Sequence, residues 1–174
     1  VEKMGGTITF ESKKGVGTTF VIRVPFKIDL DADKREESKD VSEKSIKGMH
    51  VLLAEDNELN MEIAEFLLQN EGAEVTKAWN GQEIVELFRK SESGEFDVIL
   101  MDIMMPIING YEAAKRIRSL DREDAKKIPI IAMTANAFTE DRIRAKEAGM
   151  DEHVAKPIDV ELLIKVIHKL VKHN

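Results

Sequence analysis

From Met49 to the C terminus, short apolar runs alternate with longer segments whose apolar residues recur at helical spacing. The apolar runs are predicted strands, at residues 51–54, 73–78, 98–101, 130–133 and 153–155. A predicted helix follows each of them, so this part of the chain consists of five strand–helix units. Units of this length predict a parallel sheet with helices on both faces, because consecutive parallel strands need a crossover segment.

The composition of the predicted strands indicates their order in the sheet. The first, third and fourth are apolar throughout, as expected of central strands that are buried on both faces. The second and fifth mix apolar and polar residues, which favours the two edges. The predicted fold class is therefore α/β with the flavodoxin-like strand order 2-1-3-4-5, in which sites form beyond the carboxyl ends of the strands.

The first predicted helix has one clearly apolar face. Helical spacing groups four of its residues there, namely Leu59, Ile63, Phe66 and Leu67. We expect this face to pack against the sheet.

Two segments precede the strand–helix units. Residues 1–26 contain two predicted strands, and residues 27–47 are dense in charged side chains and poor in apolar ones. The charged segment cannot bury enough apolar surface to offset its ordering entropy, which predicts a linker. A solvated helix between Asp31 and Lys44 is the alternative if another element packs on it. The α/β domain is expected to span residues 48–174.

Composition excludes several classes of function. The chain has no cysteine, which removes disulfides, zinc–thiolate sites and cysteine nucleophiles. No apolar run approaches the roughly 20 residues that span a bilayer, so we expect this fragment to make no membrane contact. A net charge of −7 argues against nucleic acid as a partner.

Polar side chains stand at four of the five strand ends. The first strand is followed by Glu55 and Asp56, the third by Asp102, the fourth by Thr134 and the fifth by Lys156. Because parallel strands end at the same edge of a sheet, these side chains are expected to lie close together. Three carboxylates and an ammonium group at one edge are suited to a hard divalent cation such as Mg²⁺.

Each of these residues has an ordinary structural explanation when it is taken alone. Asp56 or Asn57 could cap the following helix, Thr134 could be a cap or a buried hydroxyl, and Lys156 could be a surface lysine. Asp102 is harder to explain in this way, because a carboxylate near two others is costly without a counter-charge. Their joint placement therefore favours a phosphoryl-transfer site.

In such a site each group has a chemical role. Asp102 would be the nucleophile that accepts a phosphoryl group. The Lys156 ammonium would hold one phosphoryl oxygen and the Thr134 hydroxyl would donate to another. A cation held by the carboxylates would neutralise the charge that develops during transfer.

Four motifs resemble the receiver domain of two-component signalling proteins: AEDN at 54–57, ILMDIMMPIINGYEA at 99–113, IAMTANA at 131–137 and AKPI at 155–158. The resemblance implies that Asp102 is the phosphoacceptor and that Thr134 and Lys156 contact the phosphoryl group. It also implies a cis peptide between Lys156 and Pro157. The implied Mg²⁺ ligands are Glu55, Asp56, Asp102 and the backbone carbonyl of Met104.

One position departs from the pattern of this family. Three residues before the lysine, receivers usually carry a tyrosine or phenylalanine that rotates inward on phosphorylation, and this chain has His153. The departure leaves the site chemistry intact and puts the aromatic switch in doubt. A solvated histidine and a histidine that acts in the switch both remain open.

Residues 1–26 resemble a different domain. The segment MGGTITFESKKGVGTTFVIRVPF is similar to the closing hairpin of the ATP-binding domain of sensor histidine kinases, with its last glycine-rich box at residues 15–18. The asparagine-rich box, the DxGxG motif and a phosphoaccepting histidine on a dimerisation helix are absent from this sequence. The chain thus resembles the C-terminal fragment of a hybrid histidine kinase, and we expect this fragment, which lacks the kinase core, to bind no ATP. The hairpin could be mobile, or could pack on the receiver or on a second chain.

By resemblance, the expected function is that of a phosphorelay receiver. The phosphoryl group would come from a kinase phosphohistidine, in cis or in trans, and pass to a histidine phosphotransfer protein, with slow autodephosphorylation. The resemblance implies a cytoplasmic location for this fragment and leaves open whether the parent is anchored in a membrane. The alternatives are an interaction module that works without phosphorylation and an aspartate-dependent phosphatase. The phosphatase is disfavoured because Met104 stands where its second aspartate belongs.

Overall fold

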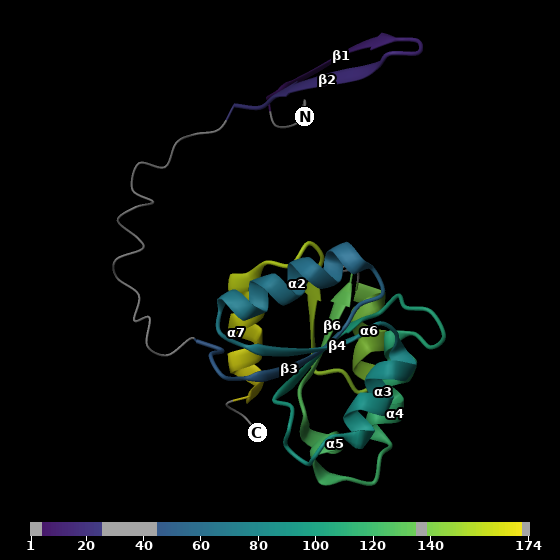
Figure 1. Ribbon diagram of the computed structural model, residues 1–174, viewed down its shortest axis with the longest axis vertical. Helices are drawn as coiled ribbons and strands as arrows, with labels where there is room; N and C mark the ends of the chain where they lie inside the picture. Colours follow the sequence, from purple (N-terminus) through teal and green to yellow (C-terminus); the bar gives the residue numbers. More distant parts are fainter. Residues whose placement is uncertain (1–4, 26–44, 135–138, 172–174) are drawn as a thin grey trace. The chain divides into compact units, whose positions relative to one another are not determined.

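The computed structural model describes residues 5–25, 45–134 and 139–171 (Figure 1). The chain divides into two compact units, Val1–Asp40 and Val41–Asn174. The larger unit contains a five-stranded parallel sheet with the order β4-β3-β5-β6-β7. This is the order 2-1-3-4-5 within the domain, so the predicted fold class is confirmed. The strands are β3 (His50–Ala54), β4 (Glu74–Ala78), β5 (Val98–Asp102), β6 (Ile130–Thr134) and β7 (Glu152–Ala155).

Six helices connect and follow these strands within the described ranges. They are α2 (Glu58–Asn70), α3 (Gly81–Lys90), α4 (Gly110–Arg118), α5 (Glu123–Lys127), α6 (Thr139–Glu147) and α7 (Val160–Val171). The helices α2 and α7 cover one face of the sheet, and α3, α4 and α6 cover the other (Figure 1).

Two apolar cores, one on each face, fix the sheet between these layers. Alternate residues of the central strands point to opposite faces, so Leu52 and Ile99 lie in the core beneath α3 and α4, while Leu53 and Leu100 lie in the core beneath α2 and α7. All four are fully buried. Burial on both faces explains why these strands are continuous apolar runs.

Helix α2 packs with a different face from the one its sequence suggested. Its buried residues are Met61, Ala64 and Leu68. Of the four predicted inward residues, Leu59, Ile63 and Phe66 are 65%, 48% and 63% exposed and Leu67 is half-buried, so that prediction is wrong. Both sets recur at helical spacing, so periodicity alone could not decide between them.

Asparagine begins each of the first three helices of the α/β unit. The side chains of Asn57, Asn80 and Asn109 accept hydrogen bonds from backbone N–H groups three residues later, at 3.1, 2.9 and 2.9 Å. Each satisfies a donor that the helix itself leaves unpaired. Of the two cap candidates in the sequence, Asn57 is the cap of α2, which leaves the Asp56 carboxylate available for another role.

One residue of the predicted linker packs into the core of the α/β unit. Ile46 is fully buried and belongs to the core beneath α2 and α7. It lies in the segment 27–47 that the sequence predicts to be a linker, of which residues 27–44 fall outside the described residues.

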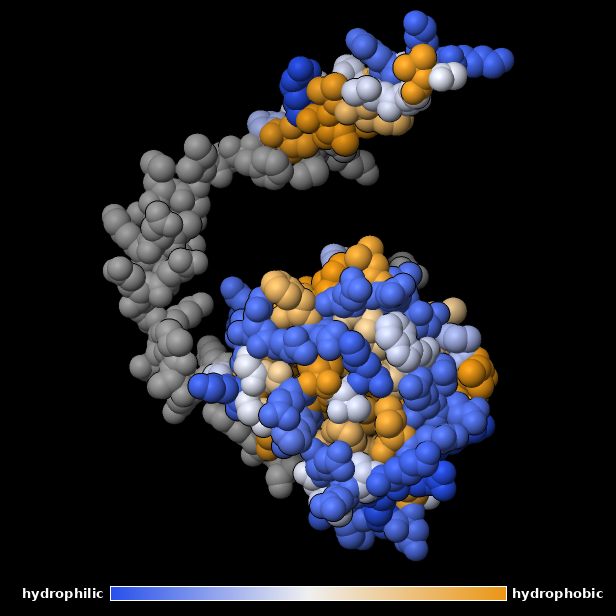
Figure 2. All heavy atoms as spheres, in the orientation of Figure 1, coloured by the Kyte–Doolittle hydropathy of each residue, from blue (hydrophilic) through white to orange (hydrophobic). Residues whose placement is uncertain are grey.

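The smaller unit contains a two-stranded antiparallel hairpin. Strand β1 (Thr7–Lys13) pairs with β2 (Gly17–Arg23), and Ile8 lies opposite Ile22 in the register. Phe10 lies opposite Phe20, and their ring centroids are 5.8 Å apart. Every residue of both strands is exposed, and apolar side chains gather along the hairpin in Figure 2. Two strands alone are marginally stable, so this apolar face is suited to burial against another element.

Arg122 holds the chain in place after α4 through several hydrogen bonds. The sequence predicted no helix here, and the structure has the single turn of α5. The Arg122 guanidinium donates to the backbone oxygens of Phe88, Ser91 and Glu92 and to both carboxylate oxygens of Asp124. It also lies 4.6 Å from the centroid of the Phe88 ring. The hydrogen bonds from Arg122 hold the pKa of Asp124 well below its usual range.

We expect Asp124→Asn to lower the free energy of unfolding by about 1 kcal/mol at pH 7. A carboxylate with a depressed pKa stabilises the fold above its unfolded-state pKa, near 3.9, and loses that effect as the pH falls towards the folded-state value. The difference between the two proteins should therefore shrink below about pH 4. Urea unfolding at several pH values measures it. The control is Glu123→Gln, at an exposed neighbouring position, which should leave the free energy of unfolding unchanged. If the difference between Asp124→Asn and the unmodified chain stays constant down to pH 2.5, the stabilising role of the Asp124 carboxylate is contradicted.

None of the helices in the described ranges has the length and apolar composition needed to cross a bilayer.

Candidate functional site

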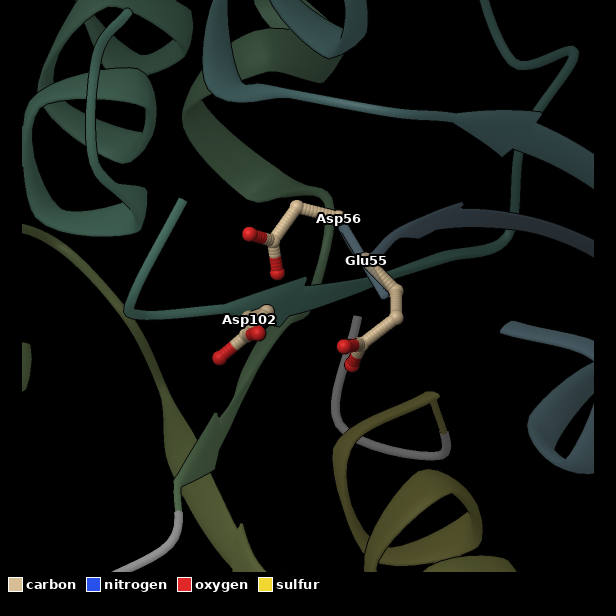
Figure 3. A group of neighbouring side chains, drawn as sticks. All are labelled: Glu55, Asp56 and Asp102. Carbon is tan, nitrogen blue, oxygen red and sulfur yellow. The ribbon is translucent and has the colours of Figure 1, made fainter. Parts of the chain in front are cut away.

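Three carboxylates converge at the carboxyl edge of the sheet (Figure 3). Glu55 and Asp56 follow β3, and Asp102 is the last residue of the neighbouring strand β5. One oxygen of each lies within 4.8 Å of one oxygen of the other two. Glu55 and Asp102 are buried, whereas Asp56 is exposed at the mouth of the site.

Lys156 joins this cluster from the loop after β7. Its ammonium group donates to Oδ2 of Asp102 at 2.8 Å and also pairs with Oε2 of Glu55. The Lys156–Pro157 peptide is cis, as the resemblance implied. One ammonium group is thus the counter-charge for two buried carboxylates.

Thr134 ends β6 and is buried at the same edge of the sheet. Its backbone oxygen accepts a hydrogen bond from the backbone N–H of Lys156 at 2.8 Å, which ties the ends of β6 and β7 together. All five candidate side chains therefore belong to strand ends at one edge. The structure places Lys156 in contact with Glu55 and Asp102, an oxygen of Asp56 within 4.8 Å of both carboxylates, and Thr134 on the strand between β5 and β7.

Asn60 is a site residue that the sequence analysis missed. Its side-chain amide donates to Oε1 of Glu55 at 3.0 Å. Since Lys156 takes the other oxygen, both carboxylate oxygens of Glu55 are held in place. The signal in the sequence was an asparagine one turn into α2, on the side that faces the strand end.

Burial and charge act in opposite directions on the pKa of the central carboxylate. Burial raises the pKa of Asp102 above its ordinary value, and the hydrogen bond from Lys156 offsets this only in part. Burial lowers the pKa of Lys156, but its hydrogen bonds to Asp102 and Glu55 outweigh this and raise it overall. Both carboxylates therefore favour the charged form of Lys156.

The three carboxylates form a donor set that suits Mg²⁺. This ion prefers oxygen ligands, is usually held by one or two carboxylates and keeps several waters. Asp56 is exposed, so water can reach the cluster, while the two buried carboxylates provide fixed charge. The Met104 backbone donates its N–H to Oδ1 of Asp102 at 3.2 Å, which places that residue at the same site, with its side chain 77% exposed.

Glycines allow the loop after β5 to approach the phosphoacceptor candidate closely. A Cβ atom on Gly110 would lie 2.2 Å from the backbone oxygen of Asp102 and 3.0 Å from the Cα of Ile103. A Cβ atom on Gly81 would lie 2.3 Å from the backbone oxygen of Ile108 in the same loop. Both contacts are with backbone, which cannot move aside as a flexible side chain can.

We expect Gly110→Ala to lower the free energy of unfolding by about 2–4 kcal/mol, because it overpacks the backbone that carries Asp102. Denaturant unfolding measures the change. Gly94→Ala is the matched control: its Cβ meets nothing within 4 Å, but its φ of +79° still adds about 1 kcal/mol of backbone strain. Equal losses in the two variants would show that close approach at Gly110 is unimportant.

His153 lies on β7 with its side chain 20% exposed, which is less solvated than an ordinary surface histidine. Its Nδ1 is 3.3 Å from Oε1 of Glu152. Arg142 and Lys146 of α6 and Asp151 line the same shallow hollow as His153.

Comparisons with known proteins agree with this geometry. The family model of the response regulator receiver domain matches residues 51–168. Hybrid signal transduction histidine kinase I of Dictyostelium discoideum is 40% identical over 120 residues, which is 68% of this chain and 7% of that protein. Aerobic respiration control sensor protein ArcB of Escherichia coli K12 is 32% identical over 169 residues, covering 97% of this chain and 21% of ArcB. The chain thus spans a small part of these relatives.

Solved structures of receiver domains are similar to the α/β unit, and two of them bear on the site. The receiver domain of sensor histidine kinase PA1611 from Pseudomonas aeruginosa PAO1 has a TM-score of 0.65 and 34% identity, over 72% of this chain and 98% of that one; it holds a magnesium ion in its active site cleft. The receiver domain of Ssk1 from Saccharomyces cerevisiae was solved with the histidine phosphotransfer protein Ypd1. It has a TM-score of 0.65 and 29% identity, and the match covers 72% of this chain and 90% of that one. With its sheet order, its acidic cluster and its family match, this chain belongs to the response regulator receiver family of two-component signalling.

Proposed function

We propose that this domain is a phosphoacceptor in a phosphorelay, with Asp102 as the residue that is phosphorylated. The observation that supports this most strongly is the cluster of three carboxylates, whose oxygens lie within 4.8 Å of one another. Two of them, Glu55 and Asp102, are paired with Lys156. Three carboxylates share one ammonium group, so the cluster keeps an excess of negative charge that a divalent cation would neutralise.

Mg²⁺ would be held by Glu55, Asp56, Asp102 and the backbone carbonyl of Met104. When bound, the cation neutralises charge on the phosphoryl oxygens during transfer. An oxygen of Asp102 forms the new bond to phosphorus as the bond from phosphorus to the donor imidazole nitrogen breaks, and the electron pair of that bond stays on the imidazole. Lys156 then releases Asp102 and holds a phosphoryl oxygen, and the Thr134 hydroxyl donates to another.

The proposed partners are a kinase phosphohistidine, in cis or in trans, as donor and a histidine phosphotransfer protein as acceptor. Two similar proteins support this, because the Dictyostelium relative is a hybrid signal transduction histidine kinase and the Ssk1 receiver was solved with Ypd1. Hydrolysis of the acyl phosphate by water would return the domain slowly to its starting state.

Acetyl phosphate and Mg²⁺ test the proposal on the purified chain. Intact-mass measurement should show the gain of one phosphoryl group, and removing Mg²⁺ with EDTA should suppress it. No gain in mass, or the same gain in EDTA, would contradict a Mg²⁺-dependent phosphoacceptor.

We further propose the domain organisation of the chain: residues 1–26 close a kinase ATP-binding domain, residues 27–47 form a linker whose Ile46 packs into the receiver core, and residues 48–174 form the receiver. The alignment with ArcB supports this, because it covers 97% of the chain and therefore includes most of the N-terminal part. The apolar face formed by Ile8, Phe10, Phe20 and Ile22 suits a hairpin that normally packs within a larger domain.

The second candidate function is an interaction module that works without phosphorylation, and it is motivated by His153 at the position of the usual aromatic switch.

Beryllofluoride, which mimics the phosphoryl group, tests both ideas. If His153 acts in place of the aromatic residue, His153→Ala should alter the change in surface mobility that beryllofluoride causes, and should leave modification by acetyl phosphate unchanged. Hydrogen exchange of α6 and β7 measures the first, and intact mass the second. The interaction module is favoured if beryllofluoride changes nothing in either protein, and equal changes in both would make His153 a bystander.

A further inference from the structure

The carboxylate of Glu55 receives hydrogen bonds on both of its oxygens. Oε1 accepts from the side-chain amide of Asn60 at 3.0 Å and from the backbone N–H of Asn57 at 3.4 Å. Oε2 pairs with the ammonium group of Lys156. Glu55 is only 1% exposed, so these contacts fix the rotation of its carboxylate as well as its position.

The two oxygens of Glu55 face different parts of the site. Lys156 contacts both Oε2 of Glu55 and Oδ2 of Asp102, so Oε2 lies on the side of the neighbouring carboxylate. Oε1 is turned to the start of α2, where both of its backbone and side-chain donors lie. When Lys156 moves to a phosphoryl oxygen, Oε2 becomes available to a cation, whereas Oε1 stays bound to Asn60.

The cap of α2 fixes the residue that holds Oε1. The Asn57 side chain accepts a hydrogen bond from the backbone N–H of Asn60 at 3.1 Å, and the Asn57 backbone oxygen accepts one from Met61 at 2.9 Å. The Asn60 amide is thus carried by a short side chain on a capped first turn. A carboxylate only accepts hydrogen bonds, so the amide must present its NH₂ group to Glu55.

A carboxylate with one oxygen held in this way offers a cation the other oxygen alone. Mg²⁺ demands near-octahedral geometry, which single carboxylate oxygens and waters can satisfy. Ca²⁺ takes about six to eight oxygens in a looser arrangement, and carboxylates bind it through one oxygen or through both. The hydrogen bond from Asn60 therefore acts against a two-oxygen contact that suits Ca²⁺ and not Mg²⁺.

We propose that Asn60 is a specificity-determining residue for the cation, which favours Mg²⁺ over Ca²⁺ by holding Oε1 of Glu55. Groups that orient metal ligands tune the metal in this way, and their loss typically changes metal affinity about 10- to 100-fold. Asn60 is itself exposed, so we expect an effect near the lower end of this range. The inference rests on the proposed function and adds to it the choice between two ions.

Separate titrations with Mg²⁺ and with Ca²⁺ measure this choice, with NMR chemical shifts as the readout and no phosphodonor present. Asn60→Ala removes the amide, keeps the backbone N–H that Asn57 caps, and introduces a residue that favours helix. The ratio of the Ca²⁺ Kd to the Mg²⁺ Kd should fall about tenfold in this variant.

Two controls test the position and the route of the effect. Gln69→Ala removes another amide of α2 that donates to a carboxylate, that of Glu65 at 3.3 Å, near the opposite end of the helix, and should leave both affinities unchanged. Glu55→Asp shortens the carboxylate side chain by one methylene and withdraws it from the Asn60 amide. In that background Asn60→Ala should change the ratio by less than about twofold.

Three results would overturn the proposal. The first is an equal ratio in Asn60→Ala and the unmodified chain, and the second is an equal loss of affinity for both ions, because Asn60 would then support the site without selecting the ion. The third is the full fall in the Glu55→Asp background, because Asn60 would then act on another group. Failure of the unmodified chain to bind Mg²⁺ is a different result, because it would contradict the proposed phosphoacceptor site itself.

Discussion

Asp102→Asn is expected to abolish phosphorylation by acetyl phosphate at every Mg²⁺ concentration. The amide is not a nucleophile towards phosphorus, and no described carboxylate other than Glu55 and Asp56 shares the cluster. Glu55 is held on one oxygen by Asn60 and on the other by Lys156. Intact mass after a timed reaction measures the loss.

Asp56→Asn is the matched variant, because it removes one carboxylate of the same cluster without removing the nucleophile. Its effect should be on Mg²⁺ binding alone, so phosphorylation should fall at low Mg²⁺ and recover at high Mg²⁺. Recovery of Asp102→Asn at high Mg²⁺, or a loss in Asp56→Asn that no Mg²⁺ concentration restores, would contradict these roles.

Lys156→Met is expected to lower the free energy of unfolding by about 3 kcal/mol in the absence of Mg²⁺, because it leaves two buried carboxylates without their counter-charge. The same substitution should tighten Mg²⁺ binding, since the cation no longer displaces the ammonium from Asp102 and Glu55. Mg²⁺ should therefore recover much of the lost stability. Phosphorylation should still be slowed, because a phosphoryl oxygen loses its positive partner.

Urea unfolding with and without Mg²⁺ separates these effects. The double variant Glu55→Gln/Lys156→Met removes one of the stranded charges and should be less destabilised than the sum of the two single variants. Unchanged stability of Lys156→Met without Mg²⁺, or weaker Mg²⁺ binding, would show that the lysine does not act as the internal counter-charge.

Much of the fold could be predicted because its signals are local. The apolar runs at β3, β5 and β6 identify central strands, and the mixed runs at β4 and β7 identify edges. The inward face of helix α2 could not be predicted from local signals. Its exposed stripe through Leu59 and its buried stripe through Met61 are both apolar and both regular, so only tertiary packing distinguishes them. The single turn of α5 is too short for any periodicity.

Most residues of the acidic cluster could be predicted, but Asn60 and the contacts between side chains could not. Strand ends converge by topology, so Glu55, Asp102 and Lys156 could be brought together before any coordinates were known. The bond from Asn60 to Glu55 depends on side-chain orientation within one helix turn. The left-handed backbone of Ile107 runs against the preference of its residue type, and no local rule predicts it.

The position of the phosphoryl group after reaction with acetyl phosphate and Mg²⁺ tests the phosphoacceptor function most directly. Borohydride reduces an acyl phosphate on aspartate to homoserine, which peptide mass spectrometry locates in the chain. We predict homoserine at Asp102 and at no other position. Homoserine at Asp56 or another aspartate, the longer alcohol 2-amino-5-hydroxypentanoic acid at Glu55 or another glutamate, or a phosphoryl group on a histidine that borohydride leaves unreduced, would contradict the assignment of Asp102.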